Sequence, residues 1–153
     1  MATMKTHSVL CDNCFVGLAL YVHVICLIFW RTVGLKVVDA RFLKPFRLFG
    51  EVDGKIVFSS EKVMFLFVEI PPTGVVPMHS HRHEQMGICL KGKAELRSET
   101  KKATVEEGMF YWFKPNEKHS VVSLVDEPSL FLDVFNLPRE DYLEKAKETL
   151  PKA

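Results

Sequence analysis

The stretch "PMHSHRHEQMGICLKG", residues 77–92, carries three of the chain's six histidines within five positions and follows them with Gln85. Three explanations compete for such a cluster. It is a surface run of polar residues, a histidine-rich pH switch, or one half of a metal site whose remaining ligand lies elsewhere in the chain. The rest of the sequence must decide among them.

Length and composition limit the kind of protein. A chain of 153 residues with 48% hydrophobic and 25% charged residues is typical of one globular domain with its own core, plus a terminal appendage. The formal net charge is +1, and no basic cluster interleaved with aromatic residues marks a recognition helix. We therefore expect no nucleic acid partner.

The four cysteines are unevenly spaced, and three of them precede the segment that carries the domain signals. This spacing does not form a disulfide framework, so it favours a reducing compartment, the cytoplasm. "CDNC", residues 11–14, lacks both the second pair of a zinc ribbon and the context of a redox loop.

Residues 1–35 form an apolar N-terminal extension around the run Phe15–Trp30. As a helix, that run would span about 24 Å against roughly 30 Å of membrane hydrocarbon, and no small-residue cleavage site follows it. We interpret the extension as a membrane anchor or a dispensable leader. Basic residues are denser after the run than before it, so an anchor would leave the domain on the cytoplasmic side.

From residue 36 the pattern is that of an all-β domain. Short stretches rich in Val, Ile and Phe are separated by turn signals at Asp53–Gly54, after Ile70, at Gly92, at Gly108 and at Pro128. This spacing predicts a sandwich or barrel over residues 36–137. Residues 138–153 have helical character, with Pro138 at the start, acidic residues in the first turn and lysines near the end.

Several apolar residues are predicted to belong to the core of this domain. They are Met86, Ile88, Leu90 and most of Phe110–Phe113. Tyr111 or Trp112 could instead face a ligand.

The spacing of the histidines suits a metal site built from several strands. His79 and His81 are two residues apart, so on an extended segment their side chains leave the same face. A straight strand from residue 79 to 85 would run about 20 Å, which is too far for one ion, so a bend within "SHRHE" must return Gln85 to the site. His119, directly after a Pro-Asn turn, is the fourth candidate ligand, and His83 is expected outside the ligand set.

Two groups of residues resemble the sequence motifs of the cupin superfamily. The first motif is matched by Gly74, His79, His81, Gln85 in place of the usual glutamate, and Gly92. The second motif is matched by Gly108, Lys114 in place of the usual proline, Asn116 in place of the usual glycine, and His119. The resemblance extends from about Leu35 to Leu143. It implies a double-stranded β-helix, or jelly-roll barrel, that holds one metal ion and forms a homodimer through an outer sheet face.

A narrower resemblance is to the small single-domain cupins grouped with the pectin-degradation protein KdgF. "HSHRHEQ" is followed here by "LDVFNLPREDYL", and that group uses three histidines and a glutamine before an Asp-x-Phe-x3-Arg ending. The ending corresponds to Asp133, Phe135 and Arg139. The resemblance implies an enzyme that promotes ring opening and ketonisation of 4,5-unsaturated uronates, and therefore a small acidic sugar as substrate.

The predicted ligand set has a consequence for the metal. Three neutral imidazoles and an amide oxygen leave the charge of a divalent ion uncompensated, which favours a Lewis-acid role toward an anionic substrate. Zn, Ni, Mn and Fe(II) all suit these nitrogen and oxygen donors, and the residues do not choose among them. No other cofactor-binding motif occurs.

Asp133 places a carboxylate in an apolar strand, where it shares parity with Phe131 and Phe135. If that face lines the barrel, Asp133 could act as general acid or base, Arg139 could bind a uronate carboxylate through its bidentate fork, and Phe135 could shape the pocket. A structural salt bridge between Asp133 and Arg139 is the rival explanation. Two alternative functions stay open: a metal-dependent dioxygenase, and a non-catalytic small-molecule-binding or regulatory cupin.

Overall fold

Alternating burial defines the strands of this protein, whose computed structural model describes residues 34–148. In Ser129–Asn136, for example, every second side chain from Ser129 to Phe135 is buried and those between are partly exposed. This is the pattern expected for strands that turn one face to a core. The predicted apolar run Phe15–Trp30 lies outside the described residues. Within residues 34–148, none of the helices is both long and apolar enough to cross a membrane.

The described residues form ten strands, a 3-10 turn η2 (Ala40–Phe42) and one helix, α1 (Glu140–Glu148). The strands are β1 (Phe46–Phe49), β2 (Val52–Ser59), β3 (Met64–Ile70), β4 (Val75–His79), β5 (Glu84–Lys91), β6 (Lys93–Ser98), β7 (Lys102–Glu106), β8 (Phe110–Phe113), β9 (His119–Ser123) and β10 (Ser129–Asn136).

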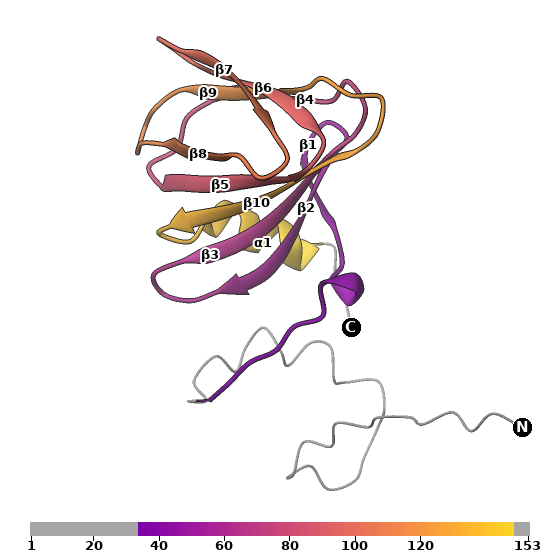
Figure 1. The fold of residues 1–153 in the computed structure, drawn as a ribbon. Helices are drawn as coiled ribbons and strands as arrows, with labels where there is room; N and C mark the ends of the chain where they lie inside the picture. The colour runs from indigo at the N-terminus through magenta and orange to yellow at the C-terminus, as the bar shows by residue number, and fades with distance from the viewer. Residues whose placement is uncertain (1–33, 149–153) are drawn as a thin grey trace, which may run out of the picture. The chain divides into compact units, whose positions relative to one another are not determined.

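The strands form two antiparallel sheets that face each other (Figure 1). One sheet has the order β1-β2-β3-β10-β5-β8 and the other the order β4-β9-β6-β7. The predicted all-β jelly-roll barrel with a short C-terminal helix is therefore confirmed. The compact unit that contains the barrel begins at Lys36.

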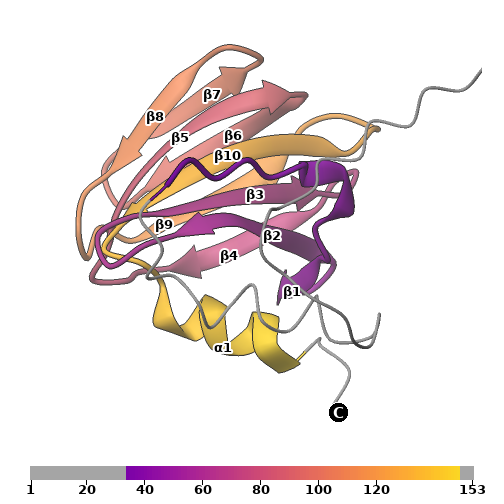
Figure 2. The same cartoon turned by 90° about the horizontal axis from the view of Figure 1, so that it is seen from below.

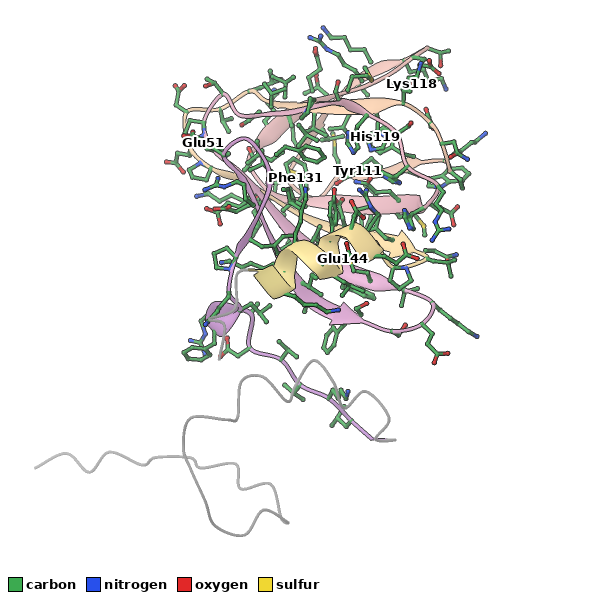
Figure 3. The ribbon with its side chains drawn as sticks, turned by 180° about the vertical axis from the view of Figure 1, so that it is seen from behind. Glu51, Tyr111, Lys118, His119, Phe131 and Glu144 are labelled. Carbon is green, nitrogen blue, oxygen red and sulfur yellow. The ribbon has the colours of Figure 1, made fainter. Side chains whose placement is uncertain are left out.

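The core lies between the two sheets. Its most deeply buried apolar side chains include Met64, Leu66, Cys89 and Phe131, each exposed by 2% or less. Figure 3 shows Phe131, Tyr111 and His119 inside the barrel, so polar groups enter this core as well.

Most predicted turns lie where the sequence placed them, with one exception. Gly92 and Gly108 adopt φ values of 91° and 83°, a region open to glycine without strain. The turn predicted at Asp53–Gly54 is wrong, because both residues belong to β2. The chain reverses instead between β1 and β2, where Gly50 has a φ of 51°. A Cβ at Gly54 would lie 3.0 Å from the Leu48 side chain, so a larger residue there would require that side chain to shift.

The outward face of β5 and β8 carries residues that were predicted to be core: Met86, Ile88, Leu90, Phe110 and Trp112. Met86, Phe110 and Trp112 are 41%, 77% and 55% exposed, so the prediction is wrong for them. Ile88 and Leu90 are only partly buried. The inward positions of β5 belong to Gln85, Gly87 and Cys89, because strand parity allows only alternate residues to face the core.

Helix α1 lies next to β1 and closes one side of the barrel (Figure 2). Tyr142 is buried between the rings of Phe46 and Phe135, whose centroids lie 6.1 and 5.9 Å from its own. Lys145 Nζ donates to the carbonyl of Leu48 at 3.0 Å. These contacts fix the helix start, and with it Arg139, relative to the barrel interior.

Leu66→Ala should lower the free energy of unfolding by about 2–5 kcal/mol, because it leaves a cavity in the core. Leu124→Ala is the matched control, since the same atoms are removed from a side chain that is 48% exposed. The control should cost less than about 1 kcal/mol. Urea denaturation of both variants measures the difference, and equal losses would contradict a core between the sheets.

Candidate metal centre

Three histidines converge at one end of the barrel. His79 ends β4 and His119 begins β9, and the two residues are paired across the sheet. His81 follows in the bend between β4 and β5, as predicted. The candidate ligand atoms of the three imidazoles all lie within 4.8 Å of one another, close enough that small side-chain rotations bring them onto one ion.

Backbone carbonyls fix which nitrogen of each ring carries the proton. A carbonyl oxygen only accepts hydrogen bonds, so an Nδ1 beside one is the protonated nitrogen, and the lone pair is left on Nε2. The Nδ1–oxygen distances are 2.9 Å from His79 to Pro77, 3.0 Å from His81 to His83 and 2.8 Å from His119 to Glu117. All three rings therefore present Nε2 as a potential metal ligand.

The polar atoms at this point of convergence fit a cation. Nε2 of His119 is buried and has no hydrogen-bond partner among the described residues. Nε2 of His81 lies 3.1 Å from Oε1 of Gln85, although both atoms offer lone pairs once Nδ1 holds the proton. A bound cation would satisfy all of these acceptors together. The neutral imidazoles cannot satisfy one another, because none has a second N–H group to donate.

Burial keeps the imidazoles neutral at physiological pH. Desolvation lowers the pKa of His81 and of His119 to about 4, with nearby positive charges adding to the effect. Desolvation also lowers the pKa of His79. Neutral imidazole is the form that binds metal.

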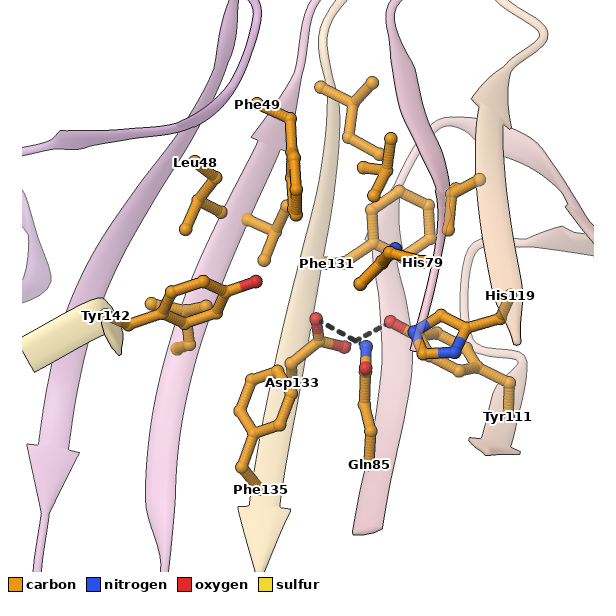
Figure 4. Close-up of a pocket in the computed structure, with 15 residues that line it drawn as sticks. Leu48, Phe49, His79, Gln85, Tyr111, His119, Phe131, Asp133, Phe135 and Tyr142 are labelled. Carbon is orange, nitrogen blue, oxygen red and sulfur yellow. Dashed lines mark hydrogen bonds between the residues drawn. The ribbon is translucent and has the colours of Figure 1, made fainter. Parts of the chain in front are cut away.

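Gln85 connects the histidines to a buried carboxylate. Its Nε2 donates to Oδ2 of Asp133 at 3.0 Å, and the Tyr111 hydroxyl donates to Oδ1 of the same carboxylate (Figure 4). Asp133 is 5% exposed, and this burial raises its pKa to about 6 against the lowering effects of Tyr111, Gln85 and Arg139. The carboxyl group can therefore gain or lose a proton near neutral pH.

Arg139 is buried at the start of α1 but does not pair with Asp133. Its Nε and Nη2 donate to the two carboxylate oxygens of Asp141 at 2.9 and 2.7 Å, and its guanidinium lies 4.0 Å from the Tyr142 ring centroid. Nη1 is buried and has no hydrogen-bond partner within residues 34–148. A direct Asp133–Arg139 salt bridge, the rival explanation from the sequence, does not form.

His83 lies outside the group of three histidines. It is 6% exposed, and its Nε2 lies 3.3 Å from the Glu140 carboxylate, which also accepts from Arg82 at 2.6 Å. This position agrees with the expectation that His83 is a neighbour of the ligand set.

A cavity between the sheets brings these groups into one space. Its lining includes His79, Gln85, His119 and Asp133, together with Phe135 and other aromatic and aliphatic side chains. Phe135 is 2% exposed, and its ring centroid lies 5.6 Å from that of His81. Five of the seven predicted site residues thus line this cavity, whereas His81 and Arg139 are not among its lining residues.

Comparison with known proteins agrees with this fold. The cupin domain family matches residues 66–135. The pectin degradation protein KdgF of Dickeya dadantii (strain 3937) is 31% identical over 101 residues, which are 65% of this chain and 91% of that protein. The chain belongs to the cupin family. The cupin resemblance seen in its motifs is confirmed.

Two further matches place this cupin among its relatives. H2HPP isomerase of Bacillus subtilis is 31% identical over 83 residues, which are 54% of this cupin and 35% of that protein. This cupin therefore spans about a third of that relative's length. The structure of KdgF from Halomonas sp. has a TM-score of 0.61 at 24% identity and covers 65% of this cupin and 92% of that chain. This last match shows a shared fold.

Sequence reasoning missed the part played by Tyr111. It named Tyr111 and Trp112 as equal candidates to face a ligand, whereas only Tyr111 enters the barrel and contacts Asp133. The signal was available in the parity of β8. Tyr111 and Phe113 share one face of β8 and Trp112 lies on the other, and Tyr111 is paired with Gly87 on the neighbouring strand, where the absent side chain leaves room for the Tyr111 ring.

Stability of the chelator-treated protein should fall as the pH is lowered from about 6.5 to about 4. Unfolded imidazoles take up protons near pH 6.5, whereas folded His81 and His119 stay neutral down to about pH 4. The unfolded state then binds more protons, so acid favours unfolding. Urea denaturation at several pH values gives the free energy of unfolding as a function of pH. This free energy should fall less steeply with falling pH for His119→Asn than for the wild type. Parallel slopes would contradict a lowered pKa at His119.

Proposed function

We propose that this cupin is a metal-dependent enzyme that acts on an unsaturated uronate or a related sugar acid, by ring opening and ketonisation. One observation carries the proposal. A buried carboxyl group with a pKa of about 6, that of Asp133, lines the same cavity as two of the three clustered histidines. A proton-transfer group thus lies beside a candidate metal centre.

His79, His81, His119 and Gln85 would hold one divalent ion. When bound, such an ion supplies a Lewis acid that polarises substrate oxygens. The four neutral ligands favour an anionic substrate, because they leave the ion's charge uncompensated. Zn, Ni, Mn and Fe(II) suit this donor set equally.

Asp133 would move the proton that ketonisation requires. The conversion of an enol to a ketone removes a proton from the hydroxyl oxygen and adds one to carbon. A carboxyl group with a pKa of about 6 accepts the first proton and returns one without a large energetic penalty near neutral pH. Phe135 would form the wall that orients the substrate against Asp133, because both line the cavity.

Arg139 would recognise the carboxylate of the substrate. Arg139 is 6% exposed and its Nη1 has no hydrogen-bond partner among the described residues, so this nitrogen keeps a donor, although Arg139 is not among the residues that line the cavity. Two of its nitrogens are already held by Asp141, which fixes the direction of the third. The likeness to a pectin degradation protein supports a sugar acid as the source of that anion.

Asp133→Ala in the full chain should lower turnover of a 4,5-unsaturated uronate about 100-fold or more, because it removes the proton carrier. Loss of the substrate's ultraviolet absorbance measures the rate, with and without a chelator. Asp126→Ala is the control, since Asp126 is exposed on the β9–β10 connection.

Each other outcome contradicts the proposal in a different way. Oxygen uptake that accompanies turnover would favour a dioxygenase. Binding of the sugar acid without turnover, unaffected by Asp133→Ala, would favour a regulatory binding protein.

This cupin is also proposed to form a homodimer through the outer face of its larger sheet. Exposed Met86, Phe110 and Trp112 on β5 and β8 adjoin the partly exposed side chains of β10, which include Leu130, Leu132 and Val134. The strand order β10-β5-β8 makes this apolar surface continuous. A continuous apolar face of this kind is typical of an association surface.

Phe110→Asp should shift the protein from dimer to monomer, because it introduces a charge into the apolar face. Phe42→Asp is the control: Phe42 lies on η2, and both phenylalanines are 77% exposed. Light scattering coupled to size-exclusion chromatography measures the mass of each. A wild-type monomer, or equal dissociation of both variants, would contradict pairing through this face.

A further inference from the structure

We infer that Asp133 and Tyr111 are positioning residues that fix the amide of Gln85 with its oxygen toward the three histidines. In this role Asp133 acts on the metal centre through Gln85, in addition to its proposed contact with substrate. The inference rests on the metal-binding part of the proposed function. It also explains why position 85 carries an amide.

The orientation of the Gln85 amide follows from the chemistry of its two neighbours. Nε2 can only donate and Oε1 can only accept, while the Asp133 carboxylate can only accept. The amide nitrogen must therefore face Asp133, at 3.0 Å, and the oxygen must face His81 Nε2, at 3.1 Å. A flipped amide would set its oxygen against the carboxylate and turn its N–H groups toward the histidines.

Tyr111 holds the carboxylate in place from the opposite strand. Asp133 on β10 and Tyr111 on β8 are both paired with Gly87 on β5, and the tyrosine hydroxyl donates to Oδ1 across that residue. A Cβ at Gly87 would lie 2.4 Å from the Tyr111 hydroxyl oxygen and 2.6 Å from Asp133 Oδ1. The hydrogen bond between Tyr111 and Asp133, drawn in Figure 4, thus occupies the space that a side chain at position 87 would fill.

The same geometry makes the residues at positions 85 and 133 depend on each other. A glutamate at position 85 would bring a second carboxylate to about the 3.0 Å contact with Asp133, where like charges repel. An asparagine at position 133 would instead place a hydrogen-bond donor opposite the donor of Gln85. Its oxygen would accept from the Tyr111 hydroxyl, and its amide nitrogen would then face Gln85 and favour the flipped amide. Gln85 therefore suits Asp133, whereas a glutamate at position 85 suits an asparagine at position 133.

A double-mutant cycle in the full chain tests this dependence with Zn2+ as the probe. Asp133→Asn alone should weaken zinc binding by about 10- to 100-fold, the range found for loss of a group that orients a metal ligand. In the Gln85→Glu background, the same Asp133→Asn change should strengthen zinc binding by about 10-fold, because it removes the repulsion between carboxylates. Competition with a chromophoric chelator measures each affinity.

Tyr111→Phe provides a second variant, because it removes one oxygen atom and keeps the ring packed against Phe113 and Phe131. It should weaken zinc binding by about 3-fold or more, while Tyr142→Phe, the matched change in the other tyrosine of residues 34–148, should leave the affinity unchanged. Circular dichroism confirms that each variant is folded.

The outcomes separate this inference from the proposed function. A wild-type protein that binds none of Zn2+, Ni2+, Mn2+ and Fe2+ would overturn both. The inference alone would be overturned if the wild type binds zinc but Asp133→Asn changes the affinity in the same direction and by the same factor in both backgrounds. A merely structural Asp133 gives that second result, because its loss would not depend on the residue at position 85.

Discussion

Buried polar atoms need partners, and this requirement governs the interior of the barrel. The jelly roll encloses imidazole, amide, carboxyl and phenol groups among aliphatic and aromatic side chains. Most of their hydrogen-bonding atoms are satisfied within the protein: the histidine Nδ1 atoms by backbone carbonyls, and the Asp133 carboxylate by Gln85 and Tyr111. The lone pairs that remain lie close together, and a bound cation would satisfy them together.

The same burial shifts the pKa of the clustered imidazoles and of Asp133 in opposite directions. Desolvation lowers the pKa of the imidazoles, which keeps them available as ligands, and raises the pKa of Asp133 into the range useful for proton transfer. Arg139 contributes positive charge from the start of α1, which opposes the rise in the pKa of Asp133. One apolar enclosure therefore sets the protonation of the clustered imidazoles and of the Asp133 carboxyl group.

The sequence predicted the fold and the convergence of three candidate ligands, because both depend on local patterns. Strand parity placed Asp133 and Phe135 inward, and the spacing of His79, His81 and His119 predicted their convergence. The prediction of core residues was wrong for Met86, Phe110 and Trp112, because apolar alternation does not tell which face of a strand meets the core. The carboxylate that binds Arg139 could not be predicted from the sequence either. Whether Asp133 or Asp141 binds it depends on where α1 docks against β1, which is a tertiary contact.

Anomalous diffraction from crystals of the full chain grown with Zn2+ tests the central claim most directly. A single strong peak per barrel is expected, about 2.0–2.2 Å from Nε2 of His79, His81 and His119 and from Oε1 of Gln85. Absence of a peak at this position, or a peak bound through the Nδ1 atoms or the nitrogen of the Gln85 amide, would contradict it.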